Sequence, residues 1–322
     1  MEFALTEEQQ ELAATVRSLL DKRADARVET YDEALWSTLC EQIGVAALGI
    51  PEEYDGAGFS LFESLVVLEE VGRSLVPSPL LSSLVTSEAL LAGADEDAKA
   101  RLLPRIAMGE VAAFVDGDAP VLDGDLATIV VLATDDGLFE VDRAEVDGAE
   151  VTWTPSMDQT IRLATVTGGT RTRIGDGPVA RARAEQVGAV GCAALAAGLA
   201  ARALDMTVSY SKERVQFGRQ IGSFQALKHR MADMLVLAEM SRSASWAASY
   251  AVSTHAEDAD ELTHVAKAYC SDAIAHLAGE TVQLHGGIAI TWEHDAHLVF
   301  KRAHALGQLF GSAREHRAAV AL

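Results

Sequence analysis

Cysteine, proline, aromatic residues and positive charge are all scarce in this chain of 322 residues. Its three cysteines are odd in number and widely spaced, which favours reduced core thiols over a disulfide framework or a metal site; they are Cys40, Cys192 and Cys270. The 48 acidic residues outnumber the 26 lysines and arginines. The resulting formal net charge of -22 argues against nucleic acid or an anionic membrane as a partner.

Targeting and membrane-spanning patterns are also missing. The N-terminus lacks the basic and apolar regions of a signal peptide. No apolar run looks long enough to span a bilayer. We therefore expect a cytoplasmic protein.

Hydrophobic residues, in contrast, make up 49% of the chain, enough to bury a sizeable core in two or three compact units. The first segment is helical, and Thr6 with Gln9 forms a plausible capping box at its start. A turn rich in glycine and proline covers residues 49–58. Apolar residues at helical spacing predict further helices over residues 35–48, 61–71, 80–91 and 97–106.

From Val111 the apolar pattern changes to the alternation of strands. Short β-branched runs separated by Asp/Gly turns predict strands over residues 128–133, 138–141, 151–153 and 161–166. The rest of the chain is alanine-rich and helical, and predicts an antiparallel bundle.

The stretch from Arg214 to Met234 connects two of these helices. Gly218 and Gly222 punctuate it, and the Ser223 hydroxyl is placed to cap the second helix, which begins near Gln225. We expect a polar turn at this point.

Two bulky residues, Phe217 and Ile221, stand in this turn and have two interpretations. In the first, both residues pack into their own helical bundle. In the second, the turn binds a molecule, to which Arg214, Phe217 and Gln225 present a guanidinium, a ring and an amide. Spacing alone favours the first interpretation.

The pattern R-x-x-F-G-x-x-I-G-x-F-Q-x-x-x-H-x-x-A-D-M, followed by Q-L-H-G-G at residues 283–287, resembles the C-terminal domain of the acyl-CoA dehydrogenases. These flavoenzymes oxidise acyl-CoA thioesters to enoyl-CoA. The resemblance implies a mainly α fold with a small β domain: an N-terminal helical domain over residues 1–110, a reduced β domain over 111–175 and a C-terminal four-helix bundle over 176–322.

In that family the FAD lies at a subunit interface. The resemblance implies that this chain serves the pyrophosphate and adenosine of an FAD held by a partner protomer, through Arg214, Phe217, Gln225, Gln283 and Gly287. A guanidinium fork suits a pyrophosphate, and glycine lets the backbone approach it closely.

The chain departs from the family where the chemistry takes place. The family's Thr-Glu-Pro-x-x-Gly-Ser-Asp segment and Gly-x-Lys strand, which hold the flavin ring and line the acyl channel, have no match here. Two positions carry the family's carboxylate base, and they are Gly311 and Gly188 in this chain. Glu185, nearly one turn before Gly188, is the fallback base, although a solvated first-turn acid also explains it.

Three histidines near the C-terminus have the spacing of a possible metal cluster: His294, His297 and His304. They lack a defined open site, and a polar helix start accounts for them. We assign no metal.

These absences and the retained motif lead to one interpretation. The chain resembles the shorter, non-catalytic subunit of an α2β2 acyl-CoA dehydrogenase, in which a longer homologous subunit supplies the flavin-ring site, the acyl-CoA channel and the base. Such enzymes act chiefly in actinobacterial steroid side-chain breakdown, and an electron-transferring flavoprotein is the expected acceptor. A self-sufficient homotetramer with Glu185 as base, and a flavin-free interaction module, remain alternatives.

Overall fold

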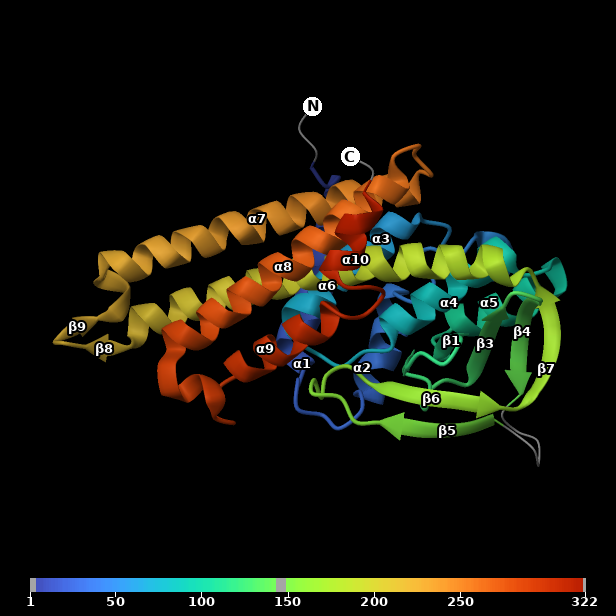
Figure 1. The fold of residues 1–322 in the computed structure, drawn as a ribbon, viewed down its shortest axis with the longest axis horizontal. Coiled ribbons are helices and arrows are strands. Elements are labelled where there is room, and N and C mark those ends of the chain that lie inside the picture. Colours follow the sequence, from blue (N-terminus) through green and yellow to red (C-terminus); the bar gives the residue numbers. More distant parts are fainter. Residues whose placement is uncertain (1–3, 143–148, 321–322) are drawn as a thin grey trace. The chain divides into compact units, whose positions relative to one another are not determined.

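The computed structural model describes residues 4–142 and 149–320 (Figure 1). Helices dominate it, and a small group of strands lies between the N-terminal and C-terminal helices in sequence. The prediction of a mainly α fold with a small β domain is confirmed. The chain divides into two compact units, one of Met1–Val67 with Val76–Gly188 and one of Leu68–Leu75 with Ala189–Leu322. The domain limits at residues 110 and 175 stay a prediction.

The first helix, α1 (Glu7–Arg23), begins with the predicted capping box. The Thr6 hydroxyl accepts a hydrogen bond from the Gln9 backbone N–H at 3.2 Å, and the Gln9 side-chain oxygen accepts one from the Thr6 N–H at 3.0 Å. Each bond satisfies a backbone donor that the helix start leaves unpaired. Three more helices follow close to the predicted ranges: α3 (Leu61–Ser74), α4 (Leu80–Gly93) and α5 (Glu96–Ala107).

The helix predicted over residues 35–48 is wrong in its limits. α2 covers Glu33–Thr38 and continues as a π-helical turn over Leu39–Ile43. Gly44 then takes a φ of 77°, the left-handed conformation that commonly ends a helix. The residues beyond it, which extended the helical pattern in the sequence, lie in turns.

Two small sheets follow α5. The larger has the strand order β1-β3-β4-β7, with β1 parallel to β3 and the other pairs antiparallel. The smaller, β2-β6-β5, is antiparallel throughout. The strands are β1 (Ala112–Asp116), β2 (Val121–Leu122), β3 (Ile129–Thr134), β4 (Gly137–Asp142), β5 (Ala149–Thr154), β6 (Leu163–Gly168) and β7 (Thr170–Gly175).

Three of the four predicted strands lie close to β3, β4 and β5, but the fourth begins at Leu163 and not at residue 161. The sequence pattern also missed β1, β2 and β7. Alanine has low strand propensity, so Ala112 and Ala113 weaken the local signal of β1. That strand is stabilised by non-local contacts, because Ala113 and Val115 pack into one buried cluster with Val130 and Leu132 of the neighbouring strand.

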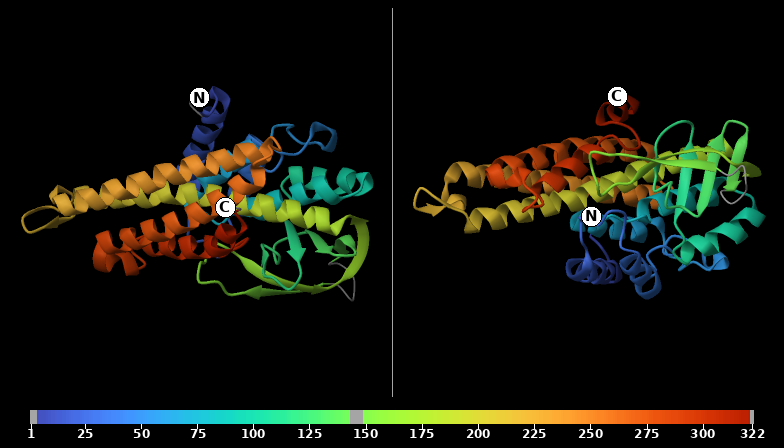
Figure 2. Two further views of the ribbon diagram at one scale, coloured as in Figure 1. Left: turned by 45° about the horizontal axis from the view of Figure 1, so that its top comes forward. Right: turned by 90° about the horizontal axis from the view of Figure 1, so that it is seen from below.

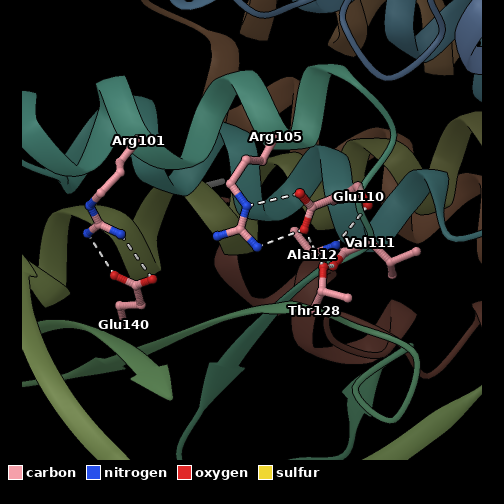
Figure 3. Close-up of polar contacts among 8 residues, drawn as sticks. Arg101, Arg105, Glu110, Val111, Ala112, Thr128 and Glu140 are labelled. Atoms are coloured by element: carbon pink, nitrogen blue, oxygen red, sulfur yellow. Dashed lines mark hydrogen bonds and ion pairs between the residues drawn. The ribbon is translucent and has the colours of Figure 1, made fainter. Parts of the chain in front are cut away.

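Two ion pairs hold α5 against its neighbours (Figure 3). Arg101 binds Glu140 of β4 through hydrogen bonds of 2.7 and 3.1 Å. Arg105 binds Glu110 through bonds of 2.7 and 3.0 Å, and the Thr128 hydroxyl donates to the same carboxylate at 2.8 Å. All four charged groups are partly exposed, so each pair contributes only about 0–1 kcal/mol. They orient the helix more than they stabilise the fold.

The second unit is the predicted helical bundle. α6 (Gly177–Glu213) belongs to the first unit up to Gly188 and to the second from Ala189. The other helices of the bundle are α7 (Gln225–Ser253), α8 (Ala259–His285), α9 (Ala296–Leu306) and the short α10 (Ala313–Ala319). Figure 2 shows α7 running alongside both the second half of α6 and α8, with the α6–α7 connection projecting from one end of the bundle.

The expectation that no apolar run is long enough to cross a membrane is wrong for α6. By length and composition this one helix of the described chain passes that test, with a mean hydropathy of 1.7 in its most apolar window. In the structure 83% of that window is buried inside the protein. Buried core helices have the same composition.

The three cysteines are free and buried, as predicted. Cys40 lies in the π-helical turn after α2, Cys192 in α6 and Cys270 in α8. Burial raises the pKa of Cys40 and Cys270 to about 12 and that of Cys192 to about 11. Each side chain is therefore a neutral thiol at physiological pH.

Candidate functional site

A short β-hairpin joins α6 to α7 and carries the motif residues. β8 (Val215–Gln216) pairs antiparallel with β9 (Arg219–Gln220). The two residues at the tip, Phe217 and Gly218, have φ values of 53° and 77°. Both central residues of the loop are thus left-handed, which matches the twist of a two-residue hairpin. A 3₁₀ turn, η3 (Ile221–Ser223), leads from the hairpin into α7.

Phe217 is held in a conformation and an environment that both disfavour it. The left-handed region costs a non-glycine residue roughly 1–2 kcal/mol, and the Phe217 side chain is 92% exposed. Its ring meets the Phe224 ring edge to face at 6.2 Å, and the Arg219 guanidinium lies 4.0 Å over the same Phe224 ring. Of the two interpretations of the turn, Ile221 fits the first, because it is buried, and Phe217 fits the second.

The polar residues assigned to a bound molecule have fixed backbones and unpaired side chains. The Arg214 N–H donates to the Tyr210 carbonyl at 2.9 Å, and the Arg214 carbonyl accepts from the Ile221 N–H at 2.8 Å. Arg214, Gln225 and Gln283 are exposed, and within the described residues their side chains make no hydrogen bond or ion pair. All three groups are available to a ligand.

The predicted cap on α7 is wrong. The Ser223 hydroxyl donates to the Gln220 carbonyl at 2.7 Å inside the 3₁₀ turn, and Phe224 occupies the cap position without a side-chain hydrogen bond. The turn therefore uses the hydroxyl that the helix start would need. The first backbone N–H groups of α7, beginning at Gln225, keep their partial positive charge.

The Gln283–Gly287 segment ends α8 with an open backbone. Gly286 takes a φ of 65°, and a 3₁₀ turn, η4 (Gly286–Ile290), follows. A Cβ built on Gly286 or on Gly287 would have no atom within 4 Å. A bound group can therefore approach this backbone closely.

The hairpin and the Gln283–Gly287 segment lie at the same end of the bundle. The Tyr210 ring, one turn before Arg214 in α6, stacks on the His285 ring with centroids 4.5 Å apart and planes at 28°. A guanidinium, a helix N-terminus, amides and open glycine backbone are found at this end of the bundle (Figure 1). This combination suits a planar, anionic ligand such as a dinucleotide.

The first expected base position, Gly311, has no room for a side chain unless His316 shifts. Gly311 has a φ of 94°, and a Cβ at this residue would lie 2.7 Å from His316 Nε2. The Gly311 carbonyl accepts a hydrogen bond of 2.8 Å from Lys267 Nζ, and the Phe310 carbonyl is 2.7 Å from His316 Nε2. Two buried side chains thus hold this turn through its backbone.

The proton positions at His316 follow from its partners. A carbonyl only accepts, so His316 Nε2 carries a proton toward Phe310. His316 Nδ1 lies 2.8 Å from His264 Nδ1, and this contact holds one proton, not two. Burial lowers the pKa of His316, the Phe310 carbonyl opposes that shift, and the charges of Lys267 and His264 lower it further.

We expect the protein to lose stability on acidification through His316. Because the pKa of His316 is lower in the folded chain than in the unfolded chain, the unfolded chain binds more protons. The stability that neutral His316 contributes is therefore fully present above the unfolded histidine pKa of about 6.5 and is lost as pH falls below it. Urea midpoints measured at about pH 7.5 and about pH 5.5 test this. His316→Gln keeps a donor for the Phe310 carbonyl but cannot be protonated, so its urea midpoint should fall less between the two pH values. Equal drops would contradict the assignment.

The second expected base position, Gly188, is buried in α6. Glu185 is exposed and does not share its surroundings. Desolvation raises the pKa of the Glu185 carboxyl, the charge of Asp116 raises it further, and Arg181 opposes both. No carboxylate occupies either family position.

The histidines near the C-terminus take part in ring contacts. His294 lies 4.4 Å from the His285 ring, and His297 meets Trp292 at 4.7 Å. Across residues 4–142 and 149–320, no group of three or more His, Cys, Asp or Glu side chains is placed to hold a metal ion.

Sequence reasoning missed Lys267, His316 and Tyr210. Lys267 had a detectable signal, since it is a lone charge on the apolar side of an alanine-rich helix. One acceptor is the Ser271 hydroxyl in the next turn, and the other two are backbone carbonyls about 40 residues away, so no pairing of charges in the sequence marks them.

Two family models match the chain: residues 6–110 match the acyl-CoA dehydrogenase N-terminal domain and residues 175–321 the C-terminal domain. The acyl-CoA dehydrogenase IpdE2 of Mycobacterium tuberculosis is 45% identical over 321 residues, covering 96% of this chain and 95% of that protein. The chain belongs to the acyl-CoA dehydrogenase family. The family resemblance in the sequence is thereby confirmed.

Two solved structures have the same fold as this chain. The Tcur3481-Tcur3483 steroid ACAD G363A variant aligns with a TM-score of 0.85 and 28% identity, covering 98% of this chain and 96% of that chain. The ChsE4-ChsE5 complex from Mycobacterium tuberculosis aligns with a TM-score of 0.87 and 23% identity, covering 99% and 98%. At that identity the second likeness shows the acyl-CoA dehydrogenase fold alone.

Proposed function

We propose that this chain is the non-catalytic subunit of a heteromeric acyl-CoA dehydrogenase that forms α,β-unsaturated acyl-CoA. The observation that carries the proposal is the closed turn at Gly311, where a base would stand in the family. Its φ of 94° and the nearby His316 ring exclude a carboxylate without rearrangement. A longer homologous subunit would therefore supply the base, the flavin-ring site and the acyl-CoA channel.

The hairpin end of the bundle fits the ADP half of FAD. Arg214 would bind the pyrophosphate, and Phe217, Gln225, Gln283 and Gly287 would border the adenosine. The side chains of Arg214, Gln225 and Gln283, which have no partner among the described residues, and the open Gly287 backbone support this assignment. FAD, when bound, accepts the hydride from the β carbon of the thioester. This chain's own residues bind and orient it.

Relatives support a heteromeric assembly and a bulky substrate. The two similar solved structures are complexes of two different chains, and one of them is described as a steroid ACAD. We therefore propose a steroid side-chain CoA thioester as the substrate, bound mainly by the longer subunit. An electron-transferring flavoprotein is the proposed acceptor.

Purification of the chain alone, and with the longer homologue encoded nearest to it, tests the proposal. We expect a colourless preparation alone and a mixed tetramer with a single FAD for each pair of chains. Glu185→Gln in the complex should leave turnover unchanged, because Glu185 is not the base. A yellow, active homotetramer whose turnover collapses in Glu185→Gln would establish the self-sufficient alternative. A complex without flavin would establish an interaction module.

A further inference from the structure

Three aromatic rings meet beside the proposed FAD site, and each comes from a different segment. Tyr210 lies in the last turn of α6, His285 is the final residue of α8, and His294 precedes α9. The His285 ring stacks on Tyr210 at 4.5 Å and lies 4.4 Å from His294, which meets the Tyr210 ring at 6.0 Å. We call these residues the three-ring cluster.

The three-ring cluster is connected directly to both cofactor segments. The Tyr210 carbonyl accepts the Arg214 N–H, so the cluster adjoins the first residue of the hairpin motif. His285 immediately precedes the open Gly286-Gly287 backbone and lies two residues after Gln283. The ring contact between Tyr210 and His285 therefore links the two segments.

His285 is costly as a mere core residue. It is 3% exposed, and its Nδ1, 2.7 Å from the Thr281 carbonyl, must carry the proton of that bond. Nε2 is then an acceptor that is buried near the Met206 backbone and forms no hydrogen bond within the described residues. A phenylalanine would fill this place without leaving a buried acceptor unpaired.

The hydrogen bond to Thr281 explains what the imidazole adds. It fixes the rotation of the ring about its side-chain bonds and so keeps the ring face against Tyr210. Burial lowers the pKa of His285; the Thr281 carbonyl opposes that shift, His294 lowers the pKa further, and the Met206 backbone opposes it. The lowered pKa favours the neutral form of the stacked ring. Stacking and anchoring are separate functions of the same side chain.

We propose that His285 is a positioning residue: its ring, stacked on Tyr210, aligns the Gln283–Gly287 backbone with the Arg214 hairpin so that both bind one FAD molecule. This inference rests on the proposed function. Neither segment holds the dinucleotide alone, because the guanidinium lies on one and the open glycine backbone on the other.

FAD titration of the flavin-depleted complex with the longer homologue tests the inference. The variants are Arg214→Ala, His285→Ala, His285→Phe and His285→Asn. His285→Ala should weaken FAD binding about threefold to tenfold, the loss expected from one aromatic pair. His285→Phe, which keeps the ring, should stay within roughly twofold of the wild type. His285→Asn, which keeps a donor for Thr281 but has no ring, should bind as weakly as His285→Ala.

The double variant Arg214→Ala with His285→Ala distinguishes positioning from general support of the fold. It should bind FAD little more weakly than Arg214→Ala alone, because His285 acts through the hairpin. FAD affinity that is retained in His285→Asn and lost in His285→Phe would overturn the inference while leaving the proposed function intact. The same holds if the losses of FAD-binding free energy in Arg214→Ala and His285→Ala add fully in the double variant. An Arg214→Ala complex that binds FAD normally would overturn both. Thermal unfolding of each complex identifies any variant that simply fails to fold.

Discussion

Lys267→Met should lower the free energy of unfolding by about 2–4 kcal/mol, a large share of a typical domain's stability. Lys267 is 1% exposed, and its ammonium group donates three hydrogen bonds: to Ser271 Oγ at 3.1 Å, the Leu306 carbonyl at 3.1 Å and the Gly311 carbonyl at 2.8 Å. Methionine has a similar length but no donor, so it removes all three bonds, two of which are buried.

Two opposing effects decide the size of this loss. Burial of the ammonium is unfavourable and lowers the pKa of Lys267, and methionine removes that cost. The lost hydrogen bonds are the larger effect, because removing one partner of a buried charged network leaves the others without water.

Urea unfolding of the full chain, in whichever state the wild type is purified, measures the Lys267→Met loss. Lys228→Met on the exposed side of α7 is the matched control and should change stability by less than about 0.5 kcal/mol. Equal midpoints for the two variants would show that Lys267 does not hold the Leu306–Gly311 turn.

Gly311→Glu should destabilise the chain by about 2–4 kcal/mol and add no dehydrogenase activity. A glutamate at this position must adopt a backbone φ of 94°, and its Cβ would press on the His316 ring. That ring cannot easily move, because both of its nitrogens are engaged in short contacts. Restoring the family's residue type therefore does not restore its geometry. A Gly311→Glu chain that keeps wild-type stability, binds flavin alone and oxidises an acyl-CoA would contradict this.

A pair of alanine variants separates the two causes of that loss. Gly44 also has a positive φ, 77°, but a Cβ there would have no atom within 4 Å. Gly44→Ala should thus show the backbone strain alone, about 1–2 kcal/mol. Gly311→Ala should cost more, and the difference measures the contact with His316.

The sequence predicts those parts of the fold whose causes are local. The Thr6–Gln9 capping box, the turn after α6 and the long helices depend on residues within a few positions of one another. The sequence does not predict β1, because its alanines are stabilised by pairing with β3, whose partner residues lie 17 positions later in the chain. The Ser223 cap fails because the turn competes for the same hydroxyl.

The sequence likewise predicts some features of the candidate site and not others. A long motif names Arg214, Phe217 and Gln225, and a short one names Gln283 and Gly287, so the sequence identifies the groups. It does not show that Phe217 projects into solvent while Ile221 is buried, since both are apolar residues in one turn. Nor does it show the closure of Gly311, because the residues that close the turn are Lys267 and His316, which the family motif does not mark.

The three buried thiols can report local unfolding of the protein. Thiolate is the nucleophile in alkylation and oxidation, and with pKa values of about 11 to 12 very little forms while the chain is folded. Cys40 belongs to the first compact unit, and Cys192 and Cys270 belong to the second. The order in which these residues react with a thiol reagent therefore reports which unit opens first, without any added label.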